Sequence, residues 1–352
     1  MASLRRALLT AATALAVVGA AGCSGGDTPS AAGTLVVSTF PFGVDQFTEA
    51  VVDPFTKATG IKVEVETGSN SDRLAQMQAD GGKAGADVVL MSDYYAALGQ
   101  QSNLFQKIPA EKVPNLATIA AFAKEDAYFG PAYSYQLNGT VYDTTKMSAA
   151  DAAKWDVYAG GNSKKVALPD ISVTAGQLMV SGVAASYGSG PYDIDAALKT
   201  LGGWAPGVLQ FYSSSTEVTN LLTQGEIVAA DALNGFATTL VGQGKNIAWT
   251  PPVSGKFMAT NRAMIPTNAA NLENAYKFID FLLSAETQAK SSELVGDLPV
   301  NPAATVAPSL TAVVGDIAKD PIAAGYATLD PAKLVPTRKD WVDRFAREVT
   351  GK

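Results

Sequence analysis

The side chains that most often carry out catalysis are nearly absent from this sequence. Its 352 residues include no histidine and one cysteine, Cys23. A Ser-His-Asp triad, a Cys-His pair, a His-ligated zinc and a histidine proton shuttle are therefore excluded. A single cysteine also excludes an intramolecular disulfide, a thiolate metal cluster and a CxxC redox pair. Because no P-loop, GxGxxG, GxSxG, HExxH or EF-hand pattern is present either, we expect no cofactor and no enzymatic activity.

The acidic residues show no clear pattern of a catalytic or metal-binding site. The nearest approach to a metal dyad is Asp193-Ile194-Asp195, which lies beside Gly190-Pro191. That context favours a solvated turn over a metal site, so we expect no bound metal. The chain has 26 basic and 33 acidic residues and a formal charge of −7. This balance argues against nucleic-acid binding, which usually needs a basic face.

The only cysteine follows a secretion signal. Arg5-Arg6 precede an apolar run from Ala7 to Ala21, and small residues lead to Cys23. This pattern is typical of a signal peptide over residues 1–22, with an apolar run too short to span a membrane. Residues 20–23 resemble the lipobox of bacterial lipoproteins, in which the cysteine is lipidated. An ordinary cleaved signal with an incidental cysteine is the alternative.

Lipidation at Cys23 predicts an extracytoplasmic protein anchored to the cell membrane. Residues 23–33 are rich in Gly and Ser and predict a flexible tether. Cleavage removes Arg5 and Arg6 and no acid, so the mature chain would have a charge of −9. No other segment combines the length of a membrane span with an absence of charges.

Strand and helix signals alternate from Thr34 onward. Apolar runs predict buried strands, and apolar residues three or four apart predict helices. The alternation predicts a mostly parallel α/β sheet, and the length is enough for two domains. Pro54 is expected to kink or break its helix, and Asn234-Gly235 is expected to form a turn. The expected strands lie at 35–37, 61–65, 88–91, 165–168 and 227–230, and the expected helices at 47–59, 72–79, 94–98, 174–187, 217–223, 274–283 and around 341–349.

Several segments resemble one family. Residues 59–63 (TGIKV), 86–89 (ADVV), 224–227 (QGEI) and 274–283 (NAYKFIDFLL) are typical of bacterial extracellular solute-binding proteins. Within that superfamily the chain is most similar to spermidine/putrescine-binding proteins of ABC importers. Residues 255–266 and the segment 296–301 (GDLPVN) follow that group's order. The resemblance covers nearly the whole mature chain.

The resemblance implies a type II periplasmic-binding-protein-like α/β fold with two lobes, a hinge and the ligand in the cleft. We expect one lobe from residues 34–136 and 260–318, and the other from residues 137–259 and 319–352. The implied partners are a small-molecule solute and the ABC permease subunits in the membrane. We expect the protein to act as a monomer.

The resemblance also supplies candidate ligand-binding residues, since ligands of open α/β sheets lie beyond the carboxyl ends of strands. Polyamine binders have an aromatic loop after the first strand and a Ser and a Tyr after the third. They have a Trp-Asn-Gly in the second lobe and an acid before the final Ile-Pro. The candidates at or near these positions are Thr39, Phe40, Ser92, Tyr94, Asp170, Thr174, Ser214, Asp231, Asn234, Asn261 and Asp297.

Several positions depart from the polyamine pattern. Asn261 stands in place of an acid, Leu233 in place of Trp, and Asp297 in place of Tyr, while Ile171 and Thr174 replace an acid pair. Two missing carboxylates would weaken binding of a dication by several kcal/mol in order-of-magnitude terms. The expected solute is therefore a smaller polyamine-like amine or an amino-phosphonate-like zwitterion. Asp170, Asp231 and Asp297 are the acids that remain to bind an amine.

Other interpretations stay open. Residues 172–176 (SVTAG) begin a helix and offer an anion site, as in binders of phosphonates, thiamine and ferric iron, or plain N-capping by Ser172 or Thr174. A ferric iron or thiamine-type binding protein is thus an alternative, although the tyrosine pair of iron binders is missing after residue 230. An extracytoplasmic enzyme and a structural surface lipoprotein are further rivals. Phe40 and Tyr94 could instead be packing residues, Asn234 a turn residue and Asn261 a strand cap.

Overall fold

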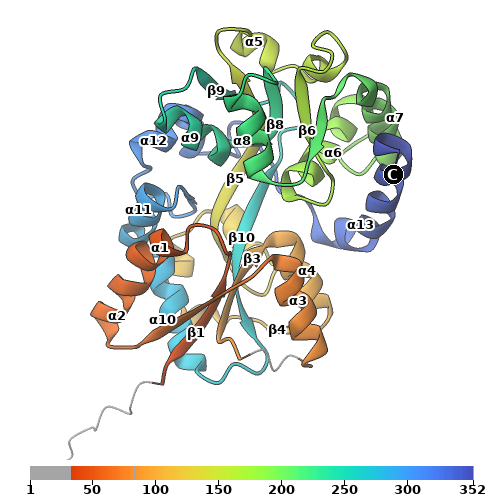
Figure 1. Ribbon diagram of the computed structural model, residues 1–352. Coiled ribbons are helices and arrows are strands. Elements are labelled where there is room, and N and C mark those ends of the chain that lie inside the picture. Colours follow the sequence, from red (N-terminus) through yellow and green to blue (C-terminus); the bar gives the residue numbers. More distant parts are fainter. Residues whose placement is uncertain (1–32, 82–84, 352) are drawn as a thin grey trace, which may run out of the picture. The chain divides into compact units, whose positions relative to one another are not determined.

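The computed structural model describes residues 33–81 and 85–351. The predicted signal peptide, Cys23 and nearly all of the predicted tether therefore lie outside the described residues. Eleven strands are found in this part of the chain (Figure 1). They are β1 (Leu35–Thr39), β2 (Val63–Thr67), β3 (Val88–Ser92), β4 (Phe105–Gln106), β5 (Ala132–Asp143), β6 (Val166–Pro169), β7 (Gln210–Tyr212), β8 (Ala229–Leu233), β9 (Ile247–Thr250), β10 (Met258–Pro266) and β11 (Leu298–Pro299).

The helices alternate with these strands, as the sequence predicts. The α-helices are α1 (Val44–Phe47), α2 (Asp53–Thr59), α3 (Asn70–Ala79), α4 (Asp93–Gln101), α5 (Ala149–Ala152), α6 (Thr174–Tyr187), α7 (Ile194–Trp204), α8 (Ser215–Thr223), α9 (Asn234–Gly242), α10 (Leu272–Leu282), α11 (Ala285–Leu294), α12 (Pro308–Val314) and α13 (Pro331–Phe345). None of the helices in the described residues is long and apolar enough to cross a membrane.

The strands form one path with the order β2-β1-β3-β10-β5-β8-β6-β7. Parallel pairs lie toward both ends of the path, where β1 pairs with β2 and β3, and β6 pairs with β7 and β8. The long strands β5 and β10 in the middle are antiparallel to their neighbours. The expectation of a mostly parallel sheet is thus wrong at the centre, because a hydrophobic run does not reveal strand direction.

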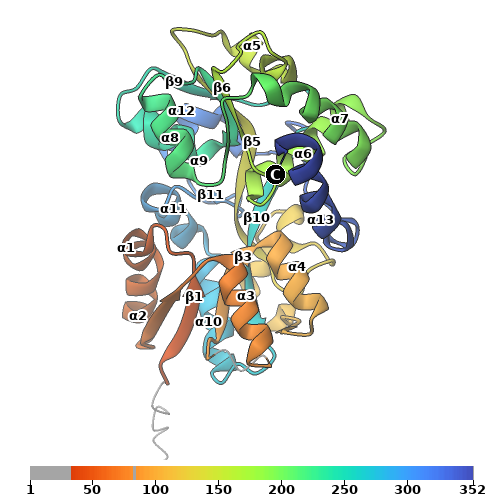
Figure 2. The same cartoon turned by 45° about the vertical axis from the view of Figure 1, so that its right-hand side comes forward.

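Strand β5 divides the sheet into two segments (Figures 1 and 2). Its residues 132–137 pair with β10 and β11, whereas its residues 138–143 pair with β8 and β9. We call the β2-β1-β3-β10 part the first segment and the β8-β6-β7 part the second segment. Strand β5 therefore connects the two segments without an intervening loop.

Central strands are buried on both faces, which explains their continuous apolar sequence. In β3, Val88 and Leu90 belong to one apolar cluster, while Val89 and Met91 belong to another with residues of α3 and α4. In β6, Val166 and Leu168 likewise face a different cluster from Ala167. Helices thus cover both faces of each segment.

Of two local predictions from the sequence, the irregular helix near Pro54 is confirmed and the turn at Asn234-Gly235 is wrong. A π-helical stretch, Thr48–Val52, interrupts the first helix directly before Asp53 and Pro54, so the predicted irregularity is present. Asn234-Gly235 does not form a turn but begins α9. The Asn234 side chain accepts a hydrogen bond from the Leu137 amide at 2.8 Å. This long-range contact holds the helix start and cannot be read from local turn propensity.

Candidate functional site

A row of polar side chains crosses the first segment. Ser92 ends β3, and Asn261 of β10 lies opposite it in the ladder. On its other side Asn261 pairs with Ser134 of β5, and its Nδ2 donates to Ser134 Oγ at 3.1 Å. A register shift in β10 directly after Asn261 breaks the ladder there. Because neighbouring strands are about 4.8 Å apart, these three residues span roughly 10 Å.

Helix α3 extends the row at the β3 end. Asn70 is its first residue, following the N-cap Ser69. Asn70 Nδ2 donates to Ser92 Oγ at 3.3 Å, and Asn70 Oδ1 accepts from Arg73 Nη2 at 3.1 Å. Ser92 is the N-cap of α4, but its side chain makes no capping bond and contacts Asn70 instead. The row therefore continues from Ser92 to the Arg73 guanidinium.

Arg73 is a buried cation, with 7% of its surface exposed. Its Nε donates to the Gly68 carbonyl oxygen, and its Nη1 donates to the Leu90 carbonyl oxygen, both at 2.9 Å. Nη1 also contacts Ser38 Oγ at 3.4 Å, and the guanidinium lies 5.4 Å from the centre of the Phe40 ring. Burial lowers the pKa of Arg73 to about 10. Within the described residues, no carboxylate comes within 4.0 Å of it.

Asp297 lies at the other end of the row, directly before β11. Strand β11 pairs with β5 through Pro299 and Ser134. Ser291 Oγ donates to Asp297 Oδ2 at 3.1 Å. Burial raises the pKa of Asp297 to about 6, while hydrogen bonds from Ser291 and Ser134 partly oppose that rise. The carboxyl group is therefore expected to change its charge near pH 6.

We name this set the polar row: Arg73, Asn70, Ser92, Asn261, Ser134 and Asp297. Asn70, Asn261 and Asp297 are partly exposed, so solvent reaches the row at these three residues, while Arg73, Ser92 and Ser134 are buried. Thr39 and Phe40 lie beside its Arg73 end, where Thr39 ends β1 and is 4% exposed. The structure thus brings five of the predicted site residues into one region: Thr39, Phe40, Ser92, Asn261 and Asp297.

Tyr94 lies in a separate cavity with Arg338 of α13. The Arg338 guanidinium is 4.6 Å from the centre of the Tyr94 ring. Arg338 Nη1 donates to Gln177 Oε1 at 2.7 Å, and Nη2 donates to the Ser172 carbonyl oxygen at 3.0 Å. The cavity, which Ser92 and Thr174 also line, has a volume of about 20 Å³. This volume suits a water molecule and not an organic solute, and Arg338 already occupies the cation-binding face of Tyr94.

The remaining predicted residues of the second segment lie near helix starts. Asp170 Oδ1 accepts from the Ser172 amide at 2.9 Å in the loop before α6. The N-cap of α6 is Val173, and neither Ser172 nor Thr174 caps the helix with its side chain. A Cβ on Gly176 would clash with the Asp170 carbonyl oxygen, which explains the glycine. Ser214 is exposed and caps α8 by accepting from the Glu217 amide at 3.3 Å.

Asp231 and Asn234 are buried away from solvent. Asp231, in β8, is 1% exposed, and its Oδ2 accepts from Asn138 Nδ2 at 2.9 Å. Asp231 Oδ1 and Asn138 Oδ1 are both buried and have no partner in the described part of the chain. Burial raises the pKa of Asp231 well above its ordinary value. A proton on Asp231 Oδ1 would make it a donor, and we expect it to bond to Asn138 Oδ1, which has no donor in the described residues.

Replacing Asp231 by asparagine is therefore expected to stabilise the fold increasingly as pH rises. In the wild type, the unfolded chain releases this proton near pH 3.8 while the folded chain retains it. Stability then falls with rising pH, by at most about 1.4 kcal/mol per pH unit, until the folded-state pKa is passed. Asp231→Asn keeps both hydrogen bonds and removes this slope.

Urea unfolding of both proteins from about pH 4 to pH 8 measures the difference. Asp126→Asn serves as control, because Asp126 is an exposed carboxyl group. A constant stability difference between Asp231→Asn and wild type over this range would show that Asp231 is ionised in the folded chain.

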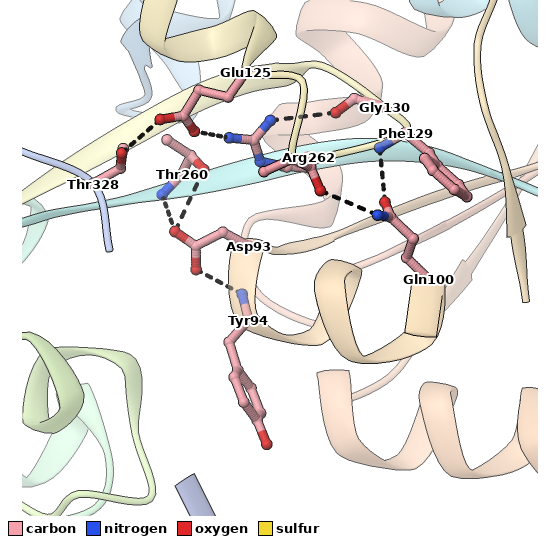
Figure 3. Close-up of polar contacts among 10 residues, drawn as sticks. Asp93, Tyr94, Gln100, Glu125, Phe129, Gly130, Thr260, Arg262 and Thr328 are labelled. Atoms are coloured by element: carbon pink, nitrogen blue, oxygen red, sulfur yellow. Dashed lines mark hydrogen bonds and ion pairs between the residues drawn. The ribbon is translucent and has the colours of Figure 1, made fainter. Parts of the chain in front are cut away.

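A buried ion pair holds β10 at Arg262 (Figure 3). Arg262 directly follows Asn261 in β10, and successive side chains of a strand point to opposite faces. Arg262 Nη2 lies 2.8 Å from Glu125 Oε2, and the Arg262 side chain is completely buried. Glu125 Oε1 accepts from Thr328 Oγ1 at 2.7 Å. Asp93 Oδ2 accepts from the Thr260 amide at 3.0 Å, and its Oδ1 accepts from the Tyr94 amide. These bonds fix β10 to the start of α4 and to Glu125.

Sequence reasoning missed Asn70, Arg73, Ser134 and Arg338. For Arg73 a signal was available, since it lies in the buried stripe of α3 with Leu74 and Met77. A cation in an apolar stripe needs a partner or a function. Ser134 and Arg338 enter through strand pairing and helix packing over long sequence distances, which no local pattern predicts. Asp193 caps α7, and Asp195 pairs with Arg344. In the described residues no group of three or more His, Cys, Asp or Glu could hold a metal ion.

Comparison with known proteins identifies relatives that match about 70% of the chain. The Haemophilus influenzae spermidine/putrescine-binding periplasmic protein 1 is 25% identical over 256 residues, which cover 70% of this chain and 71% of that protein. The Neisseria meningitidis major ferric iron-binding protein is 27% identical over 269 residues, which cover 72% of this chain and 77% of that protein. Both are solute-binding proteins by name, and they differ in the solute named.

Solved structures agree with these relatives. The crystal structure of an ABC transporter protein from Clostridium perfringens superposes with a TM-score of 0.77 at 29% identity, covering 90% of this chain and 99% of that chain. The predicted two-lobed, type II periplasmic-binding-protein-like fold is thereby confirmed. The family model described as bacterial extracellular solute-binding protein matches residues 50–324. The chain belongs to the family of bacterial extracellular solute-binding proteins.

Proposed function

We propose that this chain is the substrate-binding component of an ABC importer. It captures a small polar organic solute that carries an amine, either a polyamine-like amine or an amino-phosphonate-like zwitterion, and delivers it to the membrane permease. The polar row carries this proposal, because it is open to solvent, lies at the carboxyl end of β3, and ends in Asp297. No lysine or arginine in the described residues lies within 4.0 Å of that carboxyl group.

An ammonium group on the solute would supply the missing partner of Asp297. A charge-assisted hydrogen bond between an ammonium and a carboxylate is short and stronger than a neutral one. Ser92, Asn261 and Phe40 then orient the rest of the solute by hydrogen bonding and packing. The names of the polyamine-binding relatives support an amine. The ferric iron-binding relative supports iron as the second candidate.

We also propose how the lobes are divided. One lobe comprises residues 34–136 and 260–307, and the other residues 137–259 and 308–352. The change of β5 pairing partners after Leu137 supports the first boundary. The packing of α12 against α9 and β9 supports placing residues 308–318 in the second lobe and not in the first, where the sequence alone places them. Closure of the lobes would bring Asp170, Thr174 and Ser214 to the solute.

Asp231 and Asn234 have a different proposed role. Both side chains are buried and bonded to β5, through Asn138 and through the Leu137 amide. We propose that they hold the crossing strand in register at the boundary of the lobes and do not touch the solute. Tyr94 would reach a solute only if Arg338 moved from its ring.

Calorimetric titration of the purified soluble domain tests the proposed function. The panel comprises monoamines, diamines and polyamines, ω-amino acids and aminophosphonates, thiamine, and ferric citrate. We expect saturable binding of one amine-bearing organic solute per chain without turnover. Binding of ferric citrate alone would favour the iron alternative, and chemical conversion of a bound compound would favour an enzyme.

The anchor is a separate part of the proposal. We propose that lipidated Cys23 holds the protein at the outer face of the cell membrane, and that a monomer acts there with the permease. Cys23→Ser is expected to release the protein into the medium or periplasm, because lipidation is its only proposed attachment. Detergent phase partition and cell fractionation measure this, and an unchanged membrane fraction for Cys23→Ser would contradict the lipid anchor.

A further inference from the structure

Two opposite charges without partners lie in the polar row. Arg73 is at the α3 end and Asp297 is at the β11 end, and neither has an oppositely charged side chain within 4.0 Å in the described residues. Arg262 in the same segment differs from Arg73, because it is also buried but is bonded to Glu125. Burying a charge without a counter-ion is costly. An arrangement that leaves two such charges unpaired beside solvent therefore points to a ligand that pairs with both.

The hydrogen bonds of Arg73 leave room for such a ligand. Of its five N–H donors, Nε and both Nη1 donors contact Gly68, Leu90 and Ser38, and one Nη2 donor contacts Asn70. All four acceptors are neutral, so they hold the guanidinium in place without neutralising it. The second N–H of Nη2 has no acceptor in the described residues and is available to a ligand. The Phe40 ring beside the guanidinium excludes water from one side.

The two charges belong to one continuous region. Burial raises the pKa of the Tyr133 phenol, which is 7% exposed, and the nearby charges of Asp297 and Arg73 raise and lower that pKa by smaller amounts. Between them lie only neutral groups, Asn70, Ser92, Asn261 and Ser134, which can donate or accept hydrogen bonds. A solute lying along this row meets a cation at one end, neutral polar groups in the middle and a carboxyl group at the other end.

We propose that the solute is a zwitterion whose charges are several bonds apart, with its carboxylate, phosphonate or phosphate on Arg73 and its ammonium on Asp297. This inference rests on the proposed function and narrows its solute class. A diamine or polyamine does not fit, because its second ammonium would lie beside Arg73 and repel it. An α-amino acid fits poorly, because its charges are on neighbouring groups, while Ser92, Asn261 and Ser134, which lie between the two ends of the row, alone span roughly 10 Å.

Matched ligands of equal length test the inference on the wild-type protein. For each chain length from two to six carbons, calorimetry compares the ω-amino acid, the ω-aminophosphonate, the diamine and the simple alkylamine. We expect one of the two zwitterions to bind at least a hundredfold more tightly than the diamine of the same length. A diamine that binds as tightly as both zwitterions would overturn the inference and leave the proposed function standing. Absence of binding by every compound would contradict both.

Variants of Arg73 separate ligand binding from a structural role. Arg73→Gln is expected to weaken zwitterion binding about a hundredfold while changing alkylamine binding less than threefold. Arg73→Lys keeps the positive charge, so we expect its zwitterion affinity to lie between those of Arg73→Gln and wild type. Lys62→Gln, which removes an exposed cation from the same segment, is the control and should match wild type. Equal losses for zwitterion and alkylamine in Arg73→Gln would show a structural role only. If Arg73→Gln does not fold, the wild-type ligand comparison and Arg73→Lys decide the question.

Discussion

Replacing Asp297 by asparagine is expected to weaken binding of an amine-bearing solute about a hundredfold. The variant keeps the size of the side chain and an oxygen that can accept from Ser291. It removes the negative charge that would pair with the solute ammonium. Hydrogen bonds to charged groups contribute about 1.5–3 kcal/mol, and about 2.7 kcal/mol corresponds to a hundredfold change in Kd.

The same carboxyl group predicts the pH dependence of binding. The pKa of Asp297 is raised to about 6 in the free protein by burial. The ammonium binds the ionised form, so protonation competes with the solute as pH falls. Affinity is therefore expected to be constant above about pH 7 and to fall by up to about tenfold per pH unit below about pH 6.

Calorimetry of wild type and Asp297→Asn between about pH 4.5 and pH 8 measures both effects. The titrations use a solute that the wild type binds and whose own groups do not titrate in this range. Asp126→Asn is the matched control, since it removes an exposed carboxyl group of the same segment. Equal affinities of Asp297→Asn and wild type at pH 8 would remove Asp297 from the site.

Glu125→Gln is expected to destabilise the fold by about 3 kcal/mol. The Arg262 side chain has no exposed surface, and Glu125 is its one bonded counter-ion. The other contacts of Arg262 carry no negative charge, since Nη1 donates to the Gly130 carbonyl oxygen at 3.3 Å, the guanidinium lies 3.4 Å from the centre of the Tyr128 ring, and Nε has no hydrogen-bond partner in the described residues. Removing one partner of a buried pair typically costs about 3–5 kcal/mol because the other charge stays buried. Because the Glu125 side chain is 32% exposed, we expect a loss of stability at the lower end of this range.

Urea unfolding at neutral pH measures this change. Thr328→Val is the matched control, because it removes only the hydrogen bond to the other Glu125 oxygen, at a cost of about 1 kcal/mol. We also expect Glu125→Gln to weaken solute binding little in conditions where it is folded, since Arg262 and Asn261 face opposite sides of β10. A stability loss below about 0.5 kcal/mol in Glu125→Gln would show that the ion pair does not hold β10.

Elements with a clear hydrophobic period were predictable from the sequence. Helix α6 was expected over 174–187 and is found over those residues, because its run of small and apolar residues ends at a glycine. Strand β3 was likewise expected from four consecutive apolar residues. Strand direction was not predictable, since β5 and β10 return through the sheet to pair with strands far away in the sequence.

The residues of the candidate site were likewise predictable only in part. Ser92 and Asn261 were predicted because they follow or occupy strands that the family resemblance places at the site. Ser134 was missed because it lies within β5, and only strand pairing brings it to Asn261. Asp231 was expected to face a ligand, but its alternation in β8 turns it toward Asn138 and Tyr158. The sequence predicts which polar residue types lie at the end of a strand. Strand pairing and burial in the folded chain decide which of those side chains reach solvent.

Native mass spectrometry of the protein purified from its own host, under conditions that preserve bound solutes, tests the central claim most directly. We predict a second species heavier by the mass of one small organic molecule, lost on denaturation and absent from Asp297→Asn prepared in parallel. Fragmentation of the released molecule should reveal an amine and an anionic group. A wild-type protein that carries no small molecule, and that also gives no calorimetric binding with the amine and zwitterion panels, would contradict the account.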